Sequence, residues 1–156
     1  MRGGIVPQAE GKGFESTFKL MCQSNGLKVI RVPEAGRWIG RGSFRPIPGL
    51  CDFIIIKNGL AAFIDTKSTA NDVFAASLIK KQQLDHLMGV GDMCPAGYVV
   101  FFRGIDKVVF FSWKLLMLLS PDSSLKPEHG RTLGTIFNFD PNEIFSCYDT
   151  DDVSLI

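Results

Sequence analysis

Residues 48–67 read Pro-Gly-Leu-Cys-Asp-Phe-Ile-Ile-Ile-Lys-Asn-Gly-Leu-Ala-Ala-Phe-Ile-Asp-Thr-Lys, and this stretch decides the fold. Two apolar runs rich in Ile and Phe flank Asn58-Gly59. That dipeptide is the strongest short-range hairpin signal, because a type I′ turn needs a positive φ at both central residues. The stretch is therefore predicted to be a β-hairpin. With a two-residue turn, Asp52 lies directly opposite Asp65.

The two acids are predicted to share one face of the hairpin with Lys67. Directly opposed side chains have Cβ atoms roughly 4.5–5.5 Å apart, and like charges there destabilise a sheet. Two carboxylates placed in this way favour a bound cation, and Mg²⁺ prefers carboxylate oxygens. Asp52 and Asp65 are therefore predicted metal ligands, and the carbonyl of Thr66 is a further candidate. The alternative is that the acids mark strand ends and Lys67 extends to solvent.

This set of residues suits phosphodiester hydrolysis. The metal would neutralise the acids, polarise the scissile phosphate and lower the pKa of the attacking water. Lys67 would orient that water and stabilise the negatively charged transition state.

The composition is that of one globular domain. The chain has 156 residues, of which 46% are hydrophobic and 21% charged, and this length allows a real core. Residues 1–49 hold eight Lys/Arg and three acids, giving +5, whereas residues 140–156 hold five acids and no Lys or Arg, giving −5. A basic front half suits a polyanionic partner. Chance clustering on solvated faces is the alternative.

Four widely spaced cysteines show no Cys-x-x-Cys pair. This spacing argues against a zinc site, and the chain length argues against a disulfide framework, so reduced buried thiols in a cytosolic protein are expected. No signal peptide is visible at the N-terminus, and the apolar runs are too short to span a bilayer.

The order of the predicted elements, α-β-β-β-α-β-β-α, indicates a layered α/β domain on a mixed sheet, with no domain boundary in residues 1–156. Helical periodicity in Phe14, Phe18 and Cys22 is the signal for the first helix. The expected elements are a flexible arm over 1–12, a helix over 13–25, a strand over 27–33, a loop over 34–49, the hairpin, a helix over 76–89, strands over 96–103 and 107–111, a short helix capped by Ser112, a loop over 120–135, a short strand within 136–139 and an acidic tail over 140–156.

Asp52, twelve intervening residues and then Asp65-Thr66-Lys67 resemble the active-site signature of the PD-(D/E)xK nuclease superfamily. Residues 11–15, Gly-Lys-Gly-Phe-Glu, open the first helix as in these nucleases. Residues 81–87, Lys-Gln-Gln-Leu-Asp-His-Leu, and residues 65–69, Asp-Thr-Lys-Ser-Thr, resemble segments of RecU/Hjc-type Holliday junction resolvases. The resemblance covers about residues 11–111.

The resemblance implies a restriction-endonuclease-like fold, in which helices flank a central mixed β-sheet. It implies that Glu15 supplies another metal ligand and that Gln83 supports catalysis. Glu15 could instead be an ordinary acid in the first turn of a helix, and Gln83 a solvent-facing residue. His86 and His129 are read as non-ligands, with His86 either packing or binding phosphate.

A cluster of cations and aromatics in the loop over 34–49 is predicted to bind DNA. Such side chains hold phosphates and stack on unpaired bases. The alternative is that the aromatics tuck into the core. The predicted DNA-binding residues are Lys12, Arg37, Trp38, Arg41, Phe44, Arg45, Lys80 and Lys81.

The sequence thus predicts a Mg²⁺-dependent, structure-specific endodeoxyribonuclease, a Holliday junction resolvase, in which Mn²⁺ substitutes for Mg²⁺. A homodimer is expected, because a two-fold axis relates two active sites for paired nicks, with exposed aromatics and the strand 107–111 in its interface. The expected setting is the cytoplasm of a bacterium or a phage-infected cell. The alternatives are another nuclease of this superfamily, VRR-NUC-like or restriction-type, and a non-catalytic DNA-binding module.

Overall fold

The predicted hairpin is present. The computed structural model describes residues 7–33, 35–39, 43–47, 51–91 and 93–146, with the backbone alone for residues 7–12, 35–39 and 43–47. Strands β4 (Phe53–Lys57) and β5 (Leu60–Thr69) pair in the register that a two-residue turn dictates, so that prediction is confirmed. Asn58 and Gly59 have φ values of 51° and 82°, as a type I′ turn requires.

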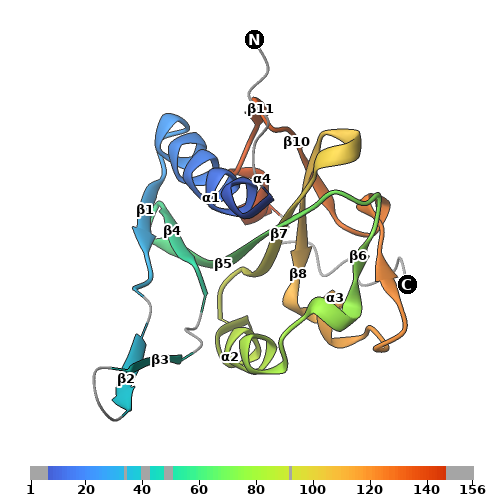
Figure 1. Ribbon diagram of the computed structural model, residues 1–156. Helices are drawn as coiled ribbons and strands as arrows, with labels where there is room; N and C mark the ends of the chain where they lie inside the picture. Colours follow the sequence, from blue (N-terminus) through green and yellow to red (C-terminus); the bar gives the residue numbers. More distant parts are fainter. Residues whose placement is uncertain (1–6, 34, 40–42, 48–50, 92, 147–156) are drawn as a thin grey trace.

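The hairpin belongs to a seven-stranded sheet in the order β1-β4-β5-β7-β8-β10-β11 (Figure 1). Strands β5 and β7 run parallel, and every other neighbouring pair in this sheet runs antiparallel. The predicted mixed sheet is therefore confirmed. The other strands of the sheet are β1 (Lys28–Arg31), β7 (Ala96–Phe102), β8 (Lys107–Ser112), β10 (Arg131–Thr135) and β11 (Asn138–Phe139).

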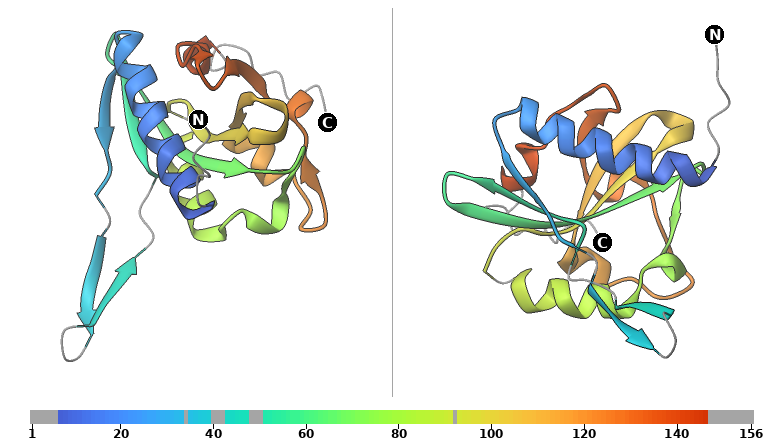
Figure 2. Two further views of the ribbon diagram at one scale, coloured as in Figure 1. Left: turned by 45° about the horizontal axis from the view of Figure 1, so that its top comes forward. Right: turned by 60° about the vertical axis from the view of Figure 1, so that its left-hand side comes forward.

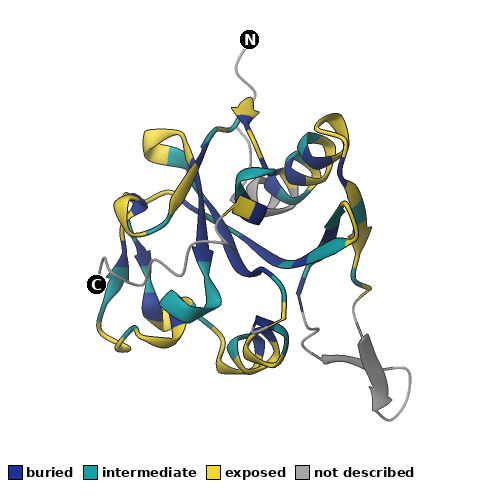
Figure 3. Cartoon of the chain, turned by 180° about the vertical axis from the view of Figure 1, so that it is seen from behind, coloured by how far each residue is buried: buried dark blue, intermediate teal, exposed yellow. Residues whose placement is uncertain are grey.

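Helices cover both faces of the sheet. Helix α1 (Pro7–Ser24) lies on one face, and helices α2 (Lys81–Gly91) and α3 (Trp113–Met117) lie on the other (Figure 2). Helix α1 buries the predicted stripe of Phe14, Phe18 and Cys22, while the outer sides of the helices are exposed (Figure 3). The short helix α4 (Glu143–Ser146) shares the core of the α1 face. Two hydrophobic layers therefore sandwich the sheet.

Two predictions for the first third of the chain were wrong. Helix α1 begins at Pro7, within the expected arm, because proline is well suited to a first helical turn. The expected loop over 34–49 contains an antiparallel pair, β2 (Ala35–Ile39) and β3 (Ser43–Ile47). This β2–β3 hairpin extends from the body of the protein (Figures 1 and 2).

Two later predictions also differ from the structure. The expected helix over 76–89 is divided into a 3₁₀ turn, Ala76–Leu78, and helix α2. The expected loop over 120–135 contains β9 (Ser124–Leu125), a 3₁₀ turn (Pro127–His129) and β10. Strand β9 pairs with β6 (Phe74–Ala75) and β10 pairs with β8. These pairings are between segments distant in sequence, which local patterns do not reveal.

Strand β8 cannot form the predicted dimer interface. It lies between β7 and β10 in the sheet, so both of its edges are paired. Its residues Val108–Phe111 are buried in the two core layers. In the described part of the chain, no helix is long and apolar enough to cross a bilayer.

Replacing Phe18 by Ala is expected to lower the free energy of unfolding by about 3–5 kcal/mol. Phe18 is 0% exposed, and its ring centroid lies 5.6 Å from that of Phe53 and 6.2 Å from that of Phe139. Chemical denaturation measures the loss. Leu20→Ala on the same helix is the control, because Leu20 is 65% exposed and should change stability by less than about 1 kcal/mol. Equal losses for both variants would contradict this packing.

Candidate active site

Asp52 immediately precedes β4, and its carboxylate is bound to the opposite strand of the hairpin. Asp52 Oδ2 accepts hydrogen bonds from the backbone N–H of Thr66, at 2.8 Å, and from Thr66 Oγ1, at 2.9 Å. The Asp52 N–H donates to the carbonyl of Ile64 at 3.1 Å, although Ile64 pairs with Phe53, so the register shifts by one residue at Asp52. The bonds to Thr66 fix the carboxylate next to β5.

Asp65 is the most confined acid of the site. Asp65 is 0% exposed. Gln83 Nε2 donates to Asp65 Oδ1 at 3.2 Å, and Lys67 Nζ lies 2.8 Å from Asp65 Oδ2. Apart from this ion pair, Oδ2 accepts no hydrogen bond from the residues that the structure describes. The carboxylate therefore has one oxygen held by an amide and the other available to cations.

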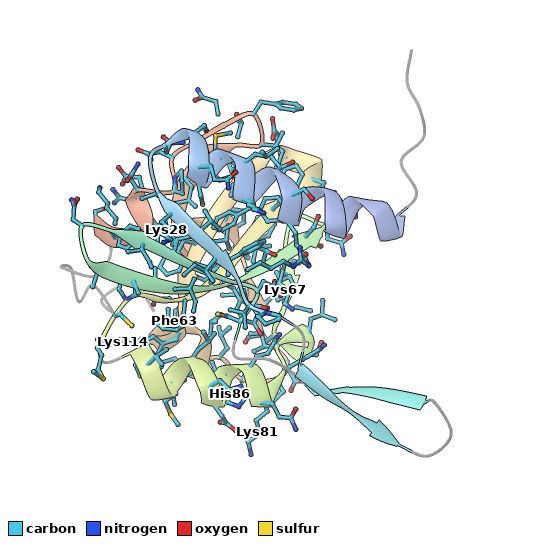
Figure 4. The ribbon with its side chains drawn as sticks, turned by 90° about the vertical axis from the view of Figure 1, so that its left-hand side faces the viewer. Lys28, Phe63, Lys67, Lys81, His86 and Lys114 are labelled. Carbon is cyan, nitrogen blue, oxygen red and sulfur yellow. The ribbon has the colours of Figure 1, made fainter. Side chains whose placement is uncertain are left out.

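Lys67 and Gln83 approach Asp65 from different elements. Lys67 follows Asp65 on β5, and its side chain is 22% exposed, so the ammonium group links the buried acid to the surface. Figure 4 shows Lys67 above helix α2, which carries Gln83. Gln83 is 9% exposed and faces the sheet, so the alternative of a solvent-facing Gln83 is wrong.

Burial raises the pKa of Asp65 to about 7. The ammonium group of Lys67 opposes this rise in the pKa, whereas the neighbouring carboxylate of Asp52 adds to it. A carboxyl group that is half protonated near neutrality, beside a second acid, can exchange its proton for a divalent cation. The oxygens of Asp52 and Asp65 fit a hard cation such as Mg²⁺.

Tyr98 also belongs to this site, and the sequence reasoning missed it. Its hydroxyl donates to Gln83 Oε1 at 2.9 Å, and Lys67 Nζ lies 5.4 Å from the centroid of its ring. Burial raises the pKa of Tyr98, so the phenol keeps its proton. Parallel pairing of β5 with β7 places Tyr98 beside Asp65. The apolar run that contains Tyr98 gave no local signal of this neighbour.

Glu15 lies on α1 and forms an ion pair with Arg31 of β1, with 3.0 Å between Oε2 and Nη2. Arg31 pairs in the sheet with Phe53, next to Asp52. Among the residues that the structure describes, no group of three or more His, Cys, Asp or Glu side chains is arranged to hold a metal ion. The metal-binding role of Glu15 therefore stays a prediction.

Among the described residues, no histidine or cysteine belongs to a group arranged to hold a metal ion. His129 Nδ1 accepts a hydrogen bond from the Lys126 N–H at 3.1 Å, and His86 is exposed on α2. Cys22 and Cys51 are buried free thiols, and burial raises the pKa of each to about 12. Thiols with such a pKa are poor nucleophiles and poor metal ligands at neutral pH.

The predicted DNA-binding residues lie on two parts of the structure. Lys80 and Lys81 are exposed at the N-terminal end of α2. The chain leaves β1 for the β2–β3 hairpin beside the acids. Val32 lies at this point, and its N–H donates to the Asp52 carbonyl at 2.9 Å. The structure gives only the backbone of Lys12, Arg37, Trp38, Phe44 and Arg45, while Arg41 lies outside the described residues.

No family model matches this chain, and no curated protein matches it. Among solved structures, the chain is similar to Archaeoglobus fulgidus Hjc, described as a Holliday junction resolvase from an archaeal hyperthermophile. The TM-score is 0.59 and the sequence identity 16%, and the match covers 78% of this chain and 95% of Hjc. This likeness shows the fold: a curled mixed sheet flanked by helices, of the restriction-endonuclease-like type.

The raised pKa of Asp65 predicts that the difference in stability between wild type and Asp65→Asn depends on pH. In the folded protein the Asp65 carboxyl keeps its proton up to about pH 7, whereas an Asp in the unfolded chain loses its proton at about pH 4. Between these values Asp65 lowers the free energy of unfolding as the pH rises. Relative to wild type, Asp65→Asn should therefore gain stability across this window, by up to about 4 kcal/mol.

Urea denaturation of the metal-free protein at a series of pH values measures this difference. Asp122→Asn is the control for loss of a carboxylate, because Asp122 is exposed. A stability difference between Asp65→Asn and wild type that stays constant with pH would show that burial does not raise this pKa.

Proposed function

We propose that this protein is a divalent-cation-dependent endonuclease that cuts branched DNA, a Holliday junction resolvase. The observation that carries the proposal is the gathering of Asp52, Lys67 and Gln83 around Asp65, with Asp65 fully buried and Lys67 reaching the surface. The fold shared with Hjc supports it. Mg²⁺ is the proposed cofactor, with Mn²⁺ substituting.

Asp52 and Asp65 would hold the cation through their carboxylate oxygens, and the carbonyl of Thr66 is a further candidate ligand. Glu15 would join them by leaving Arg31. The bound cation supplies Lewis-acid stabilisation of the phosphate and activation of water. The hydrogen bonds from Thr66 to Asp52 and from Gln83 to Asp65 orient the two carboxylates before any ligand arrives.

Lys67 would act on the reacting groups directly. Its ammonium group lies 2.8 Å from Asp65 Oδ2, and its side chain is partly exposed, so it would lie between the buried acid and bound DNA. From there it orients the attacking water and stabilises negative charge that develops on the phosphate. A lysine suits this role because its ammonium is a compact point charge with three rotatable donors.

The DNA would be held by its phosphates. The exposed Lys80 and Lys81 at the start of α2 and the basic β2–β3 hairpin would flank the acids. Four-way junctions are recognised largely by backbone and shape. Two symmetric nicks across a junction require two active sites, so the proposed active form is a two-fold homodimer.

A panel of DNA substrates tests the proposal. Four-way junctions, flaps and linear duplexes are incubated with the protein and with Mg²⁺, Mn²⁺ or Ca²⁺. Paired symmetric nicks in the junction are expected with Mg²⁺ and Mn²⁺. Cutting of flaps or linear ends alone would instead identify another nuclease of this fold, and binding without any cutting would identify a DNA-binding module.

Asp65→Asn should abolish cleavage while leaving junction binding intact. The loss of a ligand that stabilises transition-state charge costs several kcal/mol, so the rate should fall by about 100-fold or more. Single-turnover cleavage and gel-shift titration measure the two properties. Asp85→Asn, at an exposed acid on α2, is the control and should cleave at the wild-type rate. DNA cleavage by the Asp65→Asn variant would show that this site is not the active site.

Lys81→Ala should weaken junction binding and reduce the salt dependence of that binding. Each phosphate contact releases about one counterion, so the slope of log K against log salt should fall by roughly one. Lys107→Ala is the matched control, because Lys107 is exposed at the start of β8, away from α2. Equal effects of the two variants would indicate non-specific attraction only.

A further inference from the structure

Tyr98 contacts both of the groups that hold Asp65. Its hydroxyl donates to Gln83 Oε1 at 2.9 Å, and the other end of the same amide donates to Asp65 Oδ1 at 3.2 Å. Lys67 Nζ lies over its ring, 5.4 Å from the centroid, and 2.8 Å from Asp65 Oδ2. One fully buried side chain thus links the partners of both Asp65 oxygens.

We propose that Tyr98 is a positioning residue of the active site, which orients the Asp65 carboxylate by fixing Gln83 with its hydroxyl and Lys67 with its ring. The inference deepens the proposed function and rests on it for the catalytic consequence. The orientation of Asp65 itself does not depend on which DNA is cut.

The hydroxyl of Tyr98 determines which end of the Gln83 amide faces Asp65. Gln83 presents Nε2 to Asp65, where it donates to Oδ1 at 3.2 Å. Oε1 then faces the interior, where Tyr98 supplies a donor. Without that donor, a buried acceptor would be left unpaired, and this costs enough to favour another orientation of the amide.

The ring of Tyr98 acts on the other oxygen of Asp65. The face of an aromatic ring attracts a cation, and the attraction grows when both are shielded from water. It therefore favours rotamers of Lys67 that keep Nζ near Asp65 Oδ2. A side chain that only filled the core would not need the hydroxyl, and Phe would serve equally.

Nuclear magnetic resonance on the metal-free protein tests the hydroxyl without any need for activity. Gln83 is buried, while Gln82 is exposed on the same helix and serves as an internal reference. In wild type, hydrogen exchange of the Gln83 side-chain amide should be at least about tenfold slower than that of Gln82. In Tyr98→Phe most of this difference should disappear. An unchanged Gln83 amide in Tyr98→Phe would overturn the inference.

Mn²⁺ affinity, measured by calorimetry on the DNA-free protein, gives a second test. Partners that orient a metal ligand typically change metal affinity by 10-fold or more when removed, so Tyr98→Phe should bind Mn²⁺ roughly tenfold more weakly. Val109→Ala is the control for a disturbed core, because Val109 is buried against the same face on β8. Equal losses in both variants would reduce Tyr98 to a packing role.

A double-mutant cycle connects the inference to catalysis. Tyr98→Phe should lower kcat about tenfold with little change in the KM for junction DNA, and should have little further effect in a Gln83→Ala background, because residues in one chain of hydrogen bonds are not additive. Additive losses would contradict the inference. If wild type cuts no DNA, the proposed function fails, while the amide exchange and Mn²⁺ affinity still decide the role of Tyr98.

Discussion

The burial of one carboxylate organises this structure. Asp65 is 0% exposed, and an isolated ionised carboxylate in such a place would be strongly destabilising. The sheet compensates by bringing Lys67, Gln83 and, through them, Tyr98 around it. These residues come from β5, α2 and β7, so the site forms only when the sheet and helix are assembled. A site built in this way is pre-organised to bind charge rather than to bury apolar surface.

A local rule accounts for half of this site. The Asn58-Gly59 turn fixes the register of β4 and β5, the period of two places Asp65 and Lys67 on one face, and the pairing brings Asp52 to the adjacent end of the hairpin. That much could be predicted from twenty residues of sequence. The other half depends on the parallel pairing of β5 with β7, which joins segments about thirty residues apart in the chain and is set by the crossover through α2.

Non-local pairing also explains where the predicted elements were wrong. The segment 34–49 is rich in Gly and Pro, which indicates a loop, yet its two halves pair with each other as β2 and β3. Strand β10 has a break in its register between Thr132 and Gly134, and Gly134 adopts a φ of 144°, so no simple alternation marks it as a strand. In both places a partner strand, rather than local propensity, determines the structure.

The position of Glu15 does not conflict with a role beside Asp52 and Asp65. The ion pair of Glu15 with Arg31 joins side chains that are 25% and 60% exposed, and such surface pairs contribute at most about 1 kcal/mol. Coordination of a divalent cation by a carboxylate is a far stronger interaction, and phosphates of bound DNA would offer Arg31 another anion. Arg31 lies on β1 opposite Phe53, next to Asp52. The same weak pair thus keeps a third acid and an exposed cation close to Asp52, and bound DNA and metal would together favour its separation.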